Sequence, residues 1–397
     1  MDLSFSRAEE SFRQQLRSWL IANLPDGWGT DAFPEFDSLA DEVRFLIGWQ
    51  RRLNSGGWVG VHWPRAYGGR GATVIENYIL QEEFARSRAP EIIGRIGVNL
   101  VGPTLIAHGA EEQKRRYLPK ILGAEEIWCQ LFSEPNAGSD LAALRCRAER
   151  DGDTFIVNGQ KVWTSYAQFA DWGILLARTD PAAPKAKGIS FLIVDMHAPG
   201  VHVRPLKQMT GSEEFNEVFL EDVRVPAANL VGAPNQGWTI AQTTLSHERG
   251  TSPRQLVIHR ILLDELLSLA RTMRRGDAAA ATDVSIRQQL ARAVIEVELF
   301  KLHNWRTLTH LIRHGKPGPE SSVIKLFWSE MSQRLHDTAM ELLGPFGQID
   351  RGDARTVARG RWLHSYLYYR SASIFAGTNE IQRNILAERV LGLPRGR

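Results

Sequence analysis

The chain has 397 residues, more than a single hydrophobic core usually organises, so its length predicts two or three domains. Its 43% hydrophobic and 23% charged residues are typical of a globular protein and exclude a mainly disordered chain. The 48 Lys and Arg against 45 Asp and Glu leave a net charge of +3 without a long basic tract, which argues against nucleic-acid binding.

The two cysteines, Cys129 and Cys146, form neither a CxxC pair nor a cluster with metal-ligand spacing. We therefore expect no metal site, and two thiols in so long a chain indicate a reducing compartment. Apolar stretches such as residues 188–194 are far shorter than the ~20 residues that a membrane-spanning helix needs. The N-terminal sequence MDLSFSRAEESF has early acidic residues and lacks the apolar segment of a signal peptide. These features predict a cytoplasmic enzyme without a membrane span.

Residues 1–127 are predicted to form an N-terminal α-helical domain. Ser6 and Glu9 have the spacing of a capping box, in which each side chain satisfies the backbone N–H of the other residue. Apolar residues then recur every three or four positions, as an amphipathic helix requires: Phe12, Leu16, Trp19 and Leu20. The run Gly69-Arg70-Gly71 lacks the third glycine of a dinucleotide-binding fingerprint and follows no strand, so we interpret it as a turn.

Residues 128–235 are predicted to form a central β domain. Turn signals at Asp151-Gly152-Asp153 and Asn158-Gly159 enclose a short β-prone run, which predicts a hairpin over residues 150–165. Further strands are expected at 172–177, 188–195, 201–205 and 218–226. Short strands at these intervals predict an antiparallel barrel or sandwich.

Residues 236–397 are predicted to form a C-terminal helical bundle. Residues 274–283 are expected to connect two long helices, and the sequence HGKPGP at 314–319 is expected to end one of them. The order of helices, strands and helices predicts an α+β protein of three domains.

One carboxylate, Glu248, stands out after Gly237. Steps of four, three, four and four residues put it in one apolar helical series: Ala241, Leu245, Glu248, Ser252 and Leu256. An apolar setting raises the pKa of a carboxylate and suits a general base. The spacing alone favours a structural ion pair or a helix edge near solvent over a catalytic role.

Three motifs resemble the acyl-CoA dehydrogenase family. QLFSEPNAGSDLAAL at 130–144 resembles its TEP-x-AGSD signature, with Ser133 where many members have Thr. NGQKVWTS at 158–165 is similar to its NGxKxWIT hairpin, and IFAGTNEIQRNILAERVLGLPR at 374–395 is similar to its GT-x-EIQR segment. The motifs follow the family's order, and the resemblance covers essentially the whole chain.

The resemblance implies FAD bound between the β domain and the C-terminal helices. Phe132 and Trp163 would then lie against the flavin ring, and Ser165 near N5. Ser133 and Ser139 would hydrogen-bond to the ring or to the phosphates. The implied cofactor-binding residues are Gln130, Phe132, Ser133, Gly138, Ser139, Trp163, Thr164, Ser165, Gly377, Thr378 and Glu380.

Two positions depart from the family pattern. Many members carry the catalytic Glu immediately before the final Gly-Thr, where this chain has Ala376, whereas another branch places it at the position that aligns with Glu248. The resemblance therefore implies Glu248 as the base, and Ser139, Arg249 and Ala376 as substrate contacts. The usual RxxFG segment, which reaches the FAD of the neighbouring subunit, is replaced by RRGDAAAATD at 274–283.

The implied reaction is FAD-dependent α,β-dehydrogenation of an acyl-CoA thioester to the trans-2-enoyl-CoA. Glu248 would remove the α-proton while the β-hydride passes to flavin N5, and an electron-transfer flavoprotein or similar acceptor would reoxidise the cofactor. The sequences HERG at 247–250 and KLFWSE at 325–330 are similar to bacterial members linked to sterol-type or other unusual acyl-CoAs. The expected assembly is a homodimer, a homotetramer or an α2β2 complex.

Three alternatives remain open. A flavin-dependent oxidase or monooxygenase of the same fold would react directly with O2. A poorly active partner subunit of a hetero-oligomer is favoured by the missing Phe in 274–283 and opposed by Glu248, Ser133 and Trp163. A purely structural helical protein would bind no flavin and leaves the three motifs unexplained.

Overall fold

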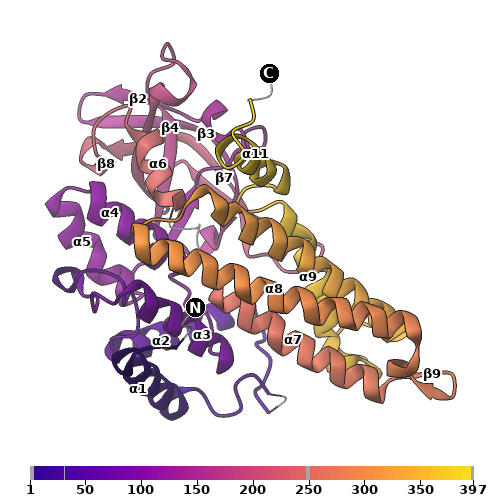
Figure 1. The fold of residues 1–397 in the computed structure, drawn as a ribbon. Coiled ribbons are helices and arrows are strands. Elements are labelled where there is room, and N and C mark those ends of the chain that lie inside the picture. Colours follow the sequence, from indigo (N-terminus) through magenta and orange to yellow (C-terminus); the bar gives the residue numbers. More distant parts are fainter. Residues whose placement is uncertain (1–3, 31, 247–250, 395–397) are drawn as a thin grey trace. The chain divides into compact units, whose positions relative to one another are not determined.

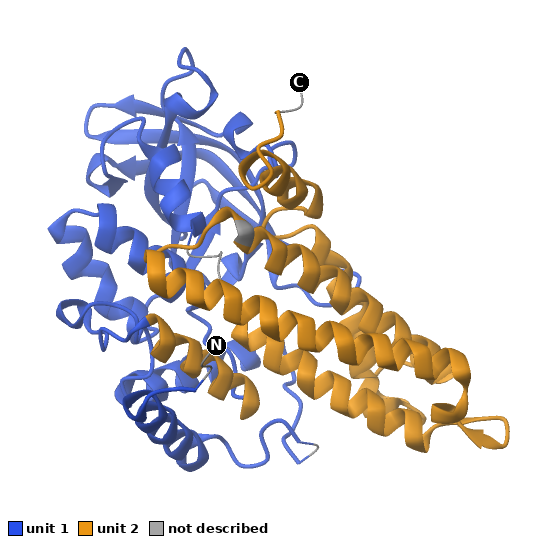
Figure 2. Ribbon diagram, viewed as in Figure 1, with its two compact units in different colours: residues 1–73, 88–248 blue, residues 74–87, 249–397 orange. Residues whose placement is uncertain are grey.

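A computed structural model describes residues 4–30, 32–246 and 251–394 of the chain (Figure 1). The chain forms two compact units, shown in different colours in Figure 2. The first unit comprises residues 1–73 and 88–248, and the second comprises residues 74–87 and 249–397.

The N-terminal helices of the first unit are α1 (Arg7–Asn23), α2 (Leu39–Ser55), α4 (Gly102–His108) and α5 (Glu111–Leu122). The predicted capping box at the start of α1 is confirmed. The Glu9 N–H donates to Ser6 Oγ at 3.3 Å, and the Ser6 N–H donates to the Glu9 carboxylate at 2.6 Å. Phe12, Leu16 and Leu20 bury one face of the helix, as the apolar spacing predicts.

The strands of the first unit follow in chain order. They are β1 (Trp128–Leu131), β2 (Arg147–Asp151), β3 (Thr154–Ser165), β4 (Trp172–Arg178), β5 (Ile189–Asp195), β6 (Val201–Leu206), β7 (Phe215–Pro226) and β8 (Leu230–Val231). Their order along the sheet is β6-β7-β3-β2-β4-β5-β8, with β1 paired to β4. The predicted hairpin is confirmed, since β2 and β3 are antiparallel and Asp151 lies opposite Thr154.

The β domain is confirmed, but its sheet is mixed and not purely antiparallel. Both β1 and β2 pair with β4 in parallel. The long excursion of the chain through β2 and β3 supplies the connection that a parallel β1–β4 pair needs. Cys129 and Leu131 of β1 are fully buried, as is common for a strand inside a parallel arrangement.

The helix α6 (Gly237–Ser246) packs against β5 in the first unit. A Cβ at Gly237 would lie 2.4 Å from the backbone carbonyl carbon of Ser190, so only glycine allows this close approach. Two polar contacts tie α6 to α4. The Thr104 and Thr244 hydroxyls lie 2.8 Å apart, and His108 Nε2 lies 3.0 Å from Thr243 Oγ1.

The second unit is a helical bundle, as predicted. Its helices are α3 (Val74–Arg86), α7 (Pro253–Thr272), α8 (Val284–His314), α9 (Ser322–Leu343), α10 (Arg361–Tyr368) and α11 (Asn379–Arg389). The core is formed by apolar side chains of α7, α8 and α9, among them Leu263, Leu266, Val297, Phe300 and Met331. Figure 1 shows these three long helices lying side by side.

The predicted connections of the bundle are also confirmed. Between α7 and α8 the chain forms a small hairpin of β9 (Arg274–Arg275) and β10 (Ala278–Ala279), at one end of the long helices in Figure 1. The helix α8 ends at His314, and Gly315 caps it in the left-handed conformation with φ of 70°.

The predicted helical series from Ala241 to Leu256 is not one continuous helix, because Thr251 and Ser252 are not helical and a separate helix, α7, begins at Pro253. Proline lacks an N–H and disfavours a helical conformation of the residue before it, so Ser252 lies outside the helix with φ of −126° and ψ of 58°. Leu256 therefore belongs to a different helix from Ala241. Glu248 itself and Arg249 lie outside the described residues.

Candidate functional site

The predicted flavin-lining segment runs from β1 directly along β3. The Val162 N–H donates to the Ser133 carbonyl at 2.9 Å, and the Lys161 ammonium donates to the Phe132 carbonyl at 3.0 Å. Gln130 is half-buried in β1, and Phe132 is buried. The first unit thus brings the motifs at 130–144 and 158–165 together.

A tight turn follows this segment. Glu134 and Ala137 exchange two backbone hydrogen bonds of 3.1 and 3.0 Å, and the exposed residues Gly138 and Ser139 come next. A Cβ at Gly138 would meet no atom within 4 Å. In the described part of the chain, the hydroxyls of Ser133 and Ser139 have no hydrogen-bond partner. Both hydroxyls are therefore available to a ligand.

Trp163 occupies an irregular position in β3. The pairing of β3 with β7 shifts between Lys161 and Thr164, so β3 carries one extra residue there, as in a β-bulge. Trp163 has φ of 61°, which is rare for a bulky residue, and 61% of its surface is exposed. Lys161 and Thr164 are fully buried. The bulge therefore turns a large aromatic ring out of the core at the end of the motif.

Thr164 and Ser165 follow Trp163 at the end of β3. The Thr164 carbonyl accepts a hydrogen bond of 3.0 Å from the Asn216 side-chain amide. The Thr164 hydroxyl is buried and has no partner among the described residues, which is unusual for a polar atom in a protein interior. Ser165 is half-buried.

The second unit holds the other predicted site residues in the loop before α11. Ala376 and Gly377 have φ of 52° and 86°, and Thr378 caps the helix by accepting the Ile381 N–H at 3.2 Å. The Gln382 side-chain amide donates to the carbonyls of Ala376 and Gly377 at 3.2 and 3.4 Å. The loop is therefore fixed in a conformation that only glycine adopts without strain.

Next to this loop, Asn379 and two residues of α9 form a group of buried hydrogen bonds that the sequence did not predict. The buried Asn379 side chain accepts hydrogen bonds of 3.0 Å from both Lys325 and Ser329. Burial lowers the pKa of Lys325 to about 8, and the Glu380 carboxylate opposes this shift. The i,i+4 spacing of Lys325 and Ser329 on α9 was the available signal. The exposed Ala376 in the loop has no hydrogen-bond partner for its N–H among the described residues.

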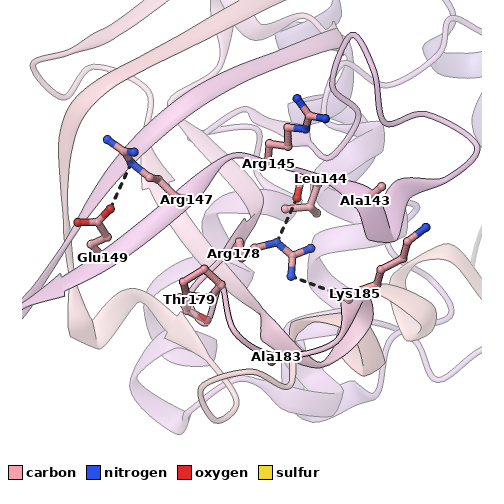
Figure 3. Close-up of a pocket in the computed structure, with 10 residues that line it drawn as sticks. Ala143, Leu144, Arg145, Arg147, Glu149, Arg178, Thr179, Ala183 and Lys185 are labelled. Atoms are coloured by element: carbon pink, nitrogen blue, oxygen red, sulfur yellow. Dashed lines mark hydrogen bonds and ion pairs between the residues drawn. The ribbon is translucent and has the colours of Figure 1, made fainter.

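A cavity of about 610 Å³ opens in the first unit beside the turn that follows Ser139 (Figure 3). Its lining includes the cationic side chains of Arg145, Arg147, Arg178 and Lys185, and the single carboxylate of Glu149. Figure 3 shows the Arg178 guanidinium between Leu144 and Lys185, whose carbonyls it contacts at 3.3 and 3.0 Å. Arg147 pairs with Glu149 at 3.3 Å and Lys185 pairs with Asp140 at 2.8 Å, so Arg145 and Arg178 carry the net positive charge that makes the cavity attractive to a polyanion. The sequence analysis missed it.

Comparison with protein families identifies the fold. Patterns described as the N-terminal, middle and C-terminal domains of acyl-CoA dehydrogenase match residues 7–125, 129–223 and 235–391. The chain belongs to the acyl-CoA dehydrogenase family.

Members of the family similar to this chain include two mycobacterial proteins named acyl-CoA dehydrogenase IpdE1. The protein from Mycobacterium tuberculosis (strain ATCC 25618 / H37Rv) is 41% identical over 396 residues, which cover 97% of this chain and 98% of the relative. The protein from Mycolicibacterium smegmatis is 39% identical over 401 residues, with 97% and 98% coverage.

Two solved structures are similar over the full length of the chain. The "Tcur3481-Tcur3483 steroid ACAD" has a TM-score of 0.84 and 32% identity, with 100% of both chains covered. The ChsE4-ChsE5 complex from Mycobacterium tuberculosis has a TM-score of 0.85 and the same identity and coverage.

The family membership confirms the predicted acyl-CoA dehydrogenase fold, the oxidoreductase class and the dependence on FAD, which is the cofactor of the family. Nowhere in the described ranges is there a helix with both the length and the apolar character that crossing a membrane requires.

Proposed function

We propose that the chain catalyses the FAD-dependent α,β-dehydrogenation of an acyl-CoA thioester to the trans-2-enoyl-CoA. The observation that carries the proposal is Trp163, whose ring is turned outward from a strained bulge and whose neighbour Val162 donates its N–H to the Ser133 carbonyl at 2.9 Å. Backbone strain of this kind persists mainly where function requires it. An exposed aromatic ring next to unpaired hydroxyls fits a planar cofactor with many acceptor atoms.

The residues present fit FAD in both units. In the first unit Trp163 supplies exposed aromatic surface, and Ser133, Ser139 and Thr164 supply hydroxyls without a partner among the described residues. The other proposed cofactor contacts of this unit are Gln130, Phe132, Gly138 and Ser165. In the second unit Gly377, Thr378 and Glu380 lie at the first turn of α11, where free backbone N–H groups favour anions such as phosphate.

We propose Glu248 as the base that removes the substrate α-proton. Bound FAD supplies the acceptor for the β-hydrogen, and an electron-transfer flavoprotein or similar acceptor reoxidises it. The α-proton of a thioester is weakly acidic, so fixed donors must stabilise the developing charge on the thioester oxygen. The N–H of Ala376 suits this role, because it is unpaired among the described residues and Gln382 holds the carbonyl of the same residue at 3.2 Å.

We assign the nucleotide end of CoA to the cavity of Figure 3. Its cationic lining complements the phosphates, and it adjoins Ser139 and Asp140, the latter paired with Lys185 at 2.8 Å. Ser139 and Arg249 are further proposed contacts of the substrate.

The small side chain of Ala376 leaves room for a sterol-type or other bulky acyl group. The similarity to a solved steroid ACAD supports the same substrate class.

We propose that the chain works as an oligomer, a homodimer, a homotetramer or an α2β2 complex. Ile295, Leu299 and Leu302 form an apolar stripe on α8 and are 59%, 42% and 54% exposed. Such a stripe favours association. Each of the two similar structures is named for a pair of proteins, which supports α2β2.

The proposed location is the cytoplasm, supported by the free buried thiols of Cys129 and Cys146.

We propose domain boundaries near residues 127 and 235. They are supported by the ends of the family matches at residues 125 and 235. These boundaries follow the order of helices and strands in the chain, whereas the compact units group segments by contact.

The test is anaerobic titration of the FAD-loaded protein with a panel of acyl-CoAs, with bleaching of the visible flavin band as the readout. We expect bleaching by the wild type and its loss in Glu248→Gln with FAD retained. Reduction of this variant at the wild-type rate would contradict the base assignment alone. A protein that takes up no FAD would contradict the proposed function. Rapid aerobic reoxidation with peroxide formation would favour the oxidase.

A further inference from the structure

A buried ion pair joins the two motif segments of the first unit. Lys161 has no exposed surface, and its Nζ lies 2.9 Å from Oε1 of Glu134, which is 8% exposed. Burying two charges is costly, and only good geometry with additional hydrogen bonds offsets that cost.

Both charged groups make the additional hydrogen bonds that burial requires. The Glu134 carboxylate accepts the N–H of Arg145 at 2.7 Å and the N–H of Cys146 at 2.8 Å. The Lys161 ammonium also donates to the Phe132 carbonyl at 3.0 Å. Lys161 thus bonds to the carbonyl of Phe132, just before Ser133, and to the side chain of Glu134, just after Ser133.

We infer that Lys161 is a positioning residue for the flavin-binding surface, an inference that rests on the proposed function. It acts through Phe132 and Glu134, because its own ammonium is buried and reaches no ligand. The bond from Val162 N–H to the Ser133 carbonyl connects the same segment to the bulge at Trp163. The backbone at Ser133 and the bulge that carries Trp163 are therefore joined by one hydrogen-bonded network.

A simple counter-charge role for Lys161 predicts a different outcome. A counter-ion is needed only while Glu134 is charged, so removing both charges would restore the site. A positioning role also requires a hydrogen-bond donor to the Phe132 carbonyl. Methionine at position 161 has no such donor. The double variant Lys161→Met with Glu134→Gln separates the two roles.

The experiment compares Lys161→Met, Glu134→Gln and the double variant with the wild type. The readouts are the thermal unfolding midpoint of the apoprotein, the Kd for added FAD from flavin fluorescence, and the shape of the visible flavin spectrum. We expect Lys161→Met to unfold at a lower temperature, because it leaves the Glu134 charge buried and unpaired. The double variant should regain the midpoint, yet bind FAD at least about tenfold more weakly, with an altered spectrum.

Lys120→Met is the matched control. Lys120 also lies 2.9 Å from a glutamate of the first unit, Glu126, but it is on α5 and bonds no residue of the site. We expect this variant to keep the wild-type Kd for FAD. A double variant with wild-type Kd and spectrum would overturn the positioning role. A wild type that binds no FAD would instead overturn the proposed function.

Discussion

The ring of Trp163 lies edge-to-face against the ring of Phe215, with centroids 6.2 Å apart and an interplanar angle of 80°. This contact fixes the side chain while leaving 61% of Trp163 exposed. A ring held in place on one edge and open to solvent presents a preorganised surface for a planar ligand.

Replacing Trp163 with Gly separates binding from stability. Glycine adopts a φ of 61° without strain, so the apoprotein should unfold at a temperature no lower than the wild type. The lost aromatic surface should weaken FAD binding by about tenfold. Differential scanning fluorimetry of the apoprotein and FAD titration measure the two effects. A lower midpoint with unchanged FAD affinity would make Trp163 a structural residue.

Local patterns in the sequence predicted most elements, since turn residues and apolar spacing act over short distances. The hairpin of β2 and β3 followed from Asp151-Gly152-Asp153, and the capping box followed from Ser6 and Glu9. The strand β1 was not predicted, because its four residues, three of them buried and Gln130 half-buried, show no regular alternation. The break before Pro253 was missed because the apolar spacing continues in phase across it.

In the candidate site, too, local motifs were predicted from the sequence, and contacts between distant residues were not. The hydroxyls of Ser133 and Ser139 and the ring of Trp163 were predicted as site groups from their motifs. The partners that hold these motifs were not, because Lys161 and Glu134 are 27 residues apart and Lys325 and Asn379 are 54 apart. Such pairs are set by tertiary packing, which one sequence does not reveal.

Substituting Gly377 with Ala should destabilise the loop before α11. The new Cβ would lie 2.7 Å from Gln382 Nε2 and would hold a φ of 86° that alanine disfavours. We expect a loss of about 1–3 kcal/mol in the free energy of unfolding. Gly276→Ala is the control, because its φ is 59° but its Cβ would meet no atom within 4 Å. Urea unfolding of both variants measures the difference, and equal losses would exclude the contact with Gln382.

Neutralising Arg145 should weaken the binding of CoA thioesters without slowing their oxidation. Its backbone N–H still donates to Glu134 in Arg145→Gln, so the turn is kept. Loss of one exposed cation should raise KM by about three- to tenfold at low ionic strength and less at high salt, with kcat unchanged. Arg150→Gln, on the neighbouring strand β2 but outside the cavity, is the control. An unchanged KM for a CoA thioester would exclude the assignment of the cavity.

Two buried histidines should make the folded state sensitive to acid. His259 Nδ1 donates to the Gln255 carbonyl at 2.7 Å and its Nε2 accepts from Ser332 Oγ at 2.9 Å, while His336 Nδ1 donates to the Ser332 carbonyl at 2.7 Å. Burial lowers the pKa of His259 to about 3 and that of His336 to about 4, from an ordinary value of 6.5. Both rings are therefore neutral in the folded protein.

The sign of the pH effect follows from this difference. Between pH 6.5 and the folded pKa values, the unfolded chain binds protons that the folded chain does not, so stability falls as pH falls. The stability that these two neutral histidines contribute to the folded state is complete above pH 6.5. It is lost as the pH drops towards 4 and then 3. His336→Phe removes one of the two groups together with an Nε2 that has no partner among the described residues, so its urea midpoint should fall less steeply with acid. A slope unchanged in His336→Phe would exclude this source of acid sensitivity.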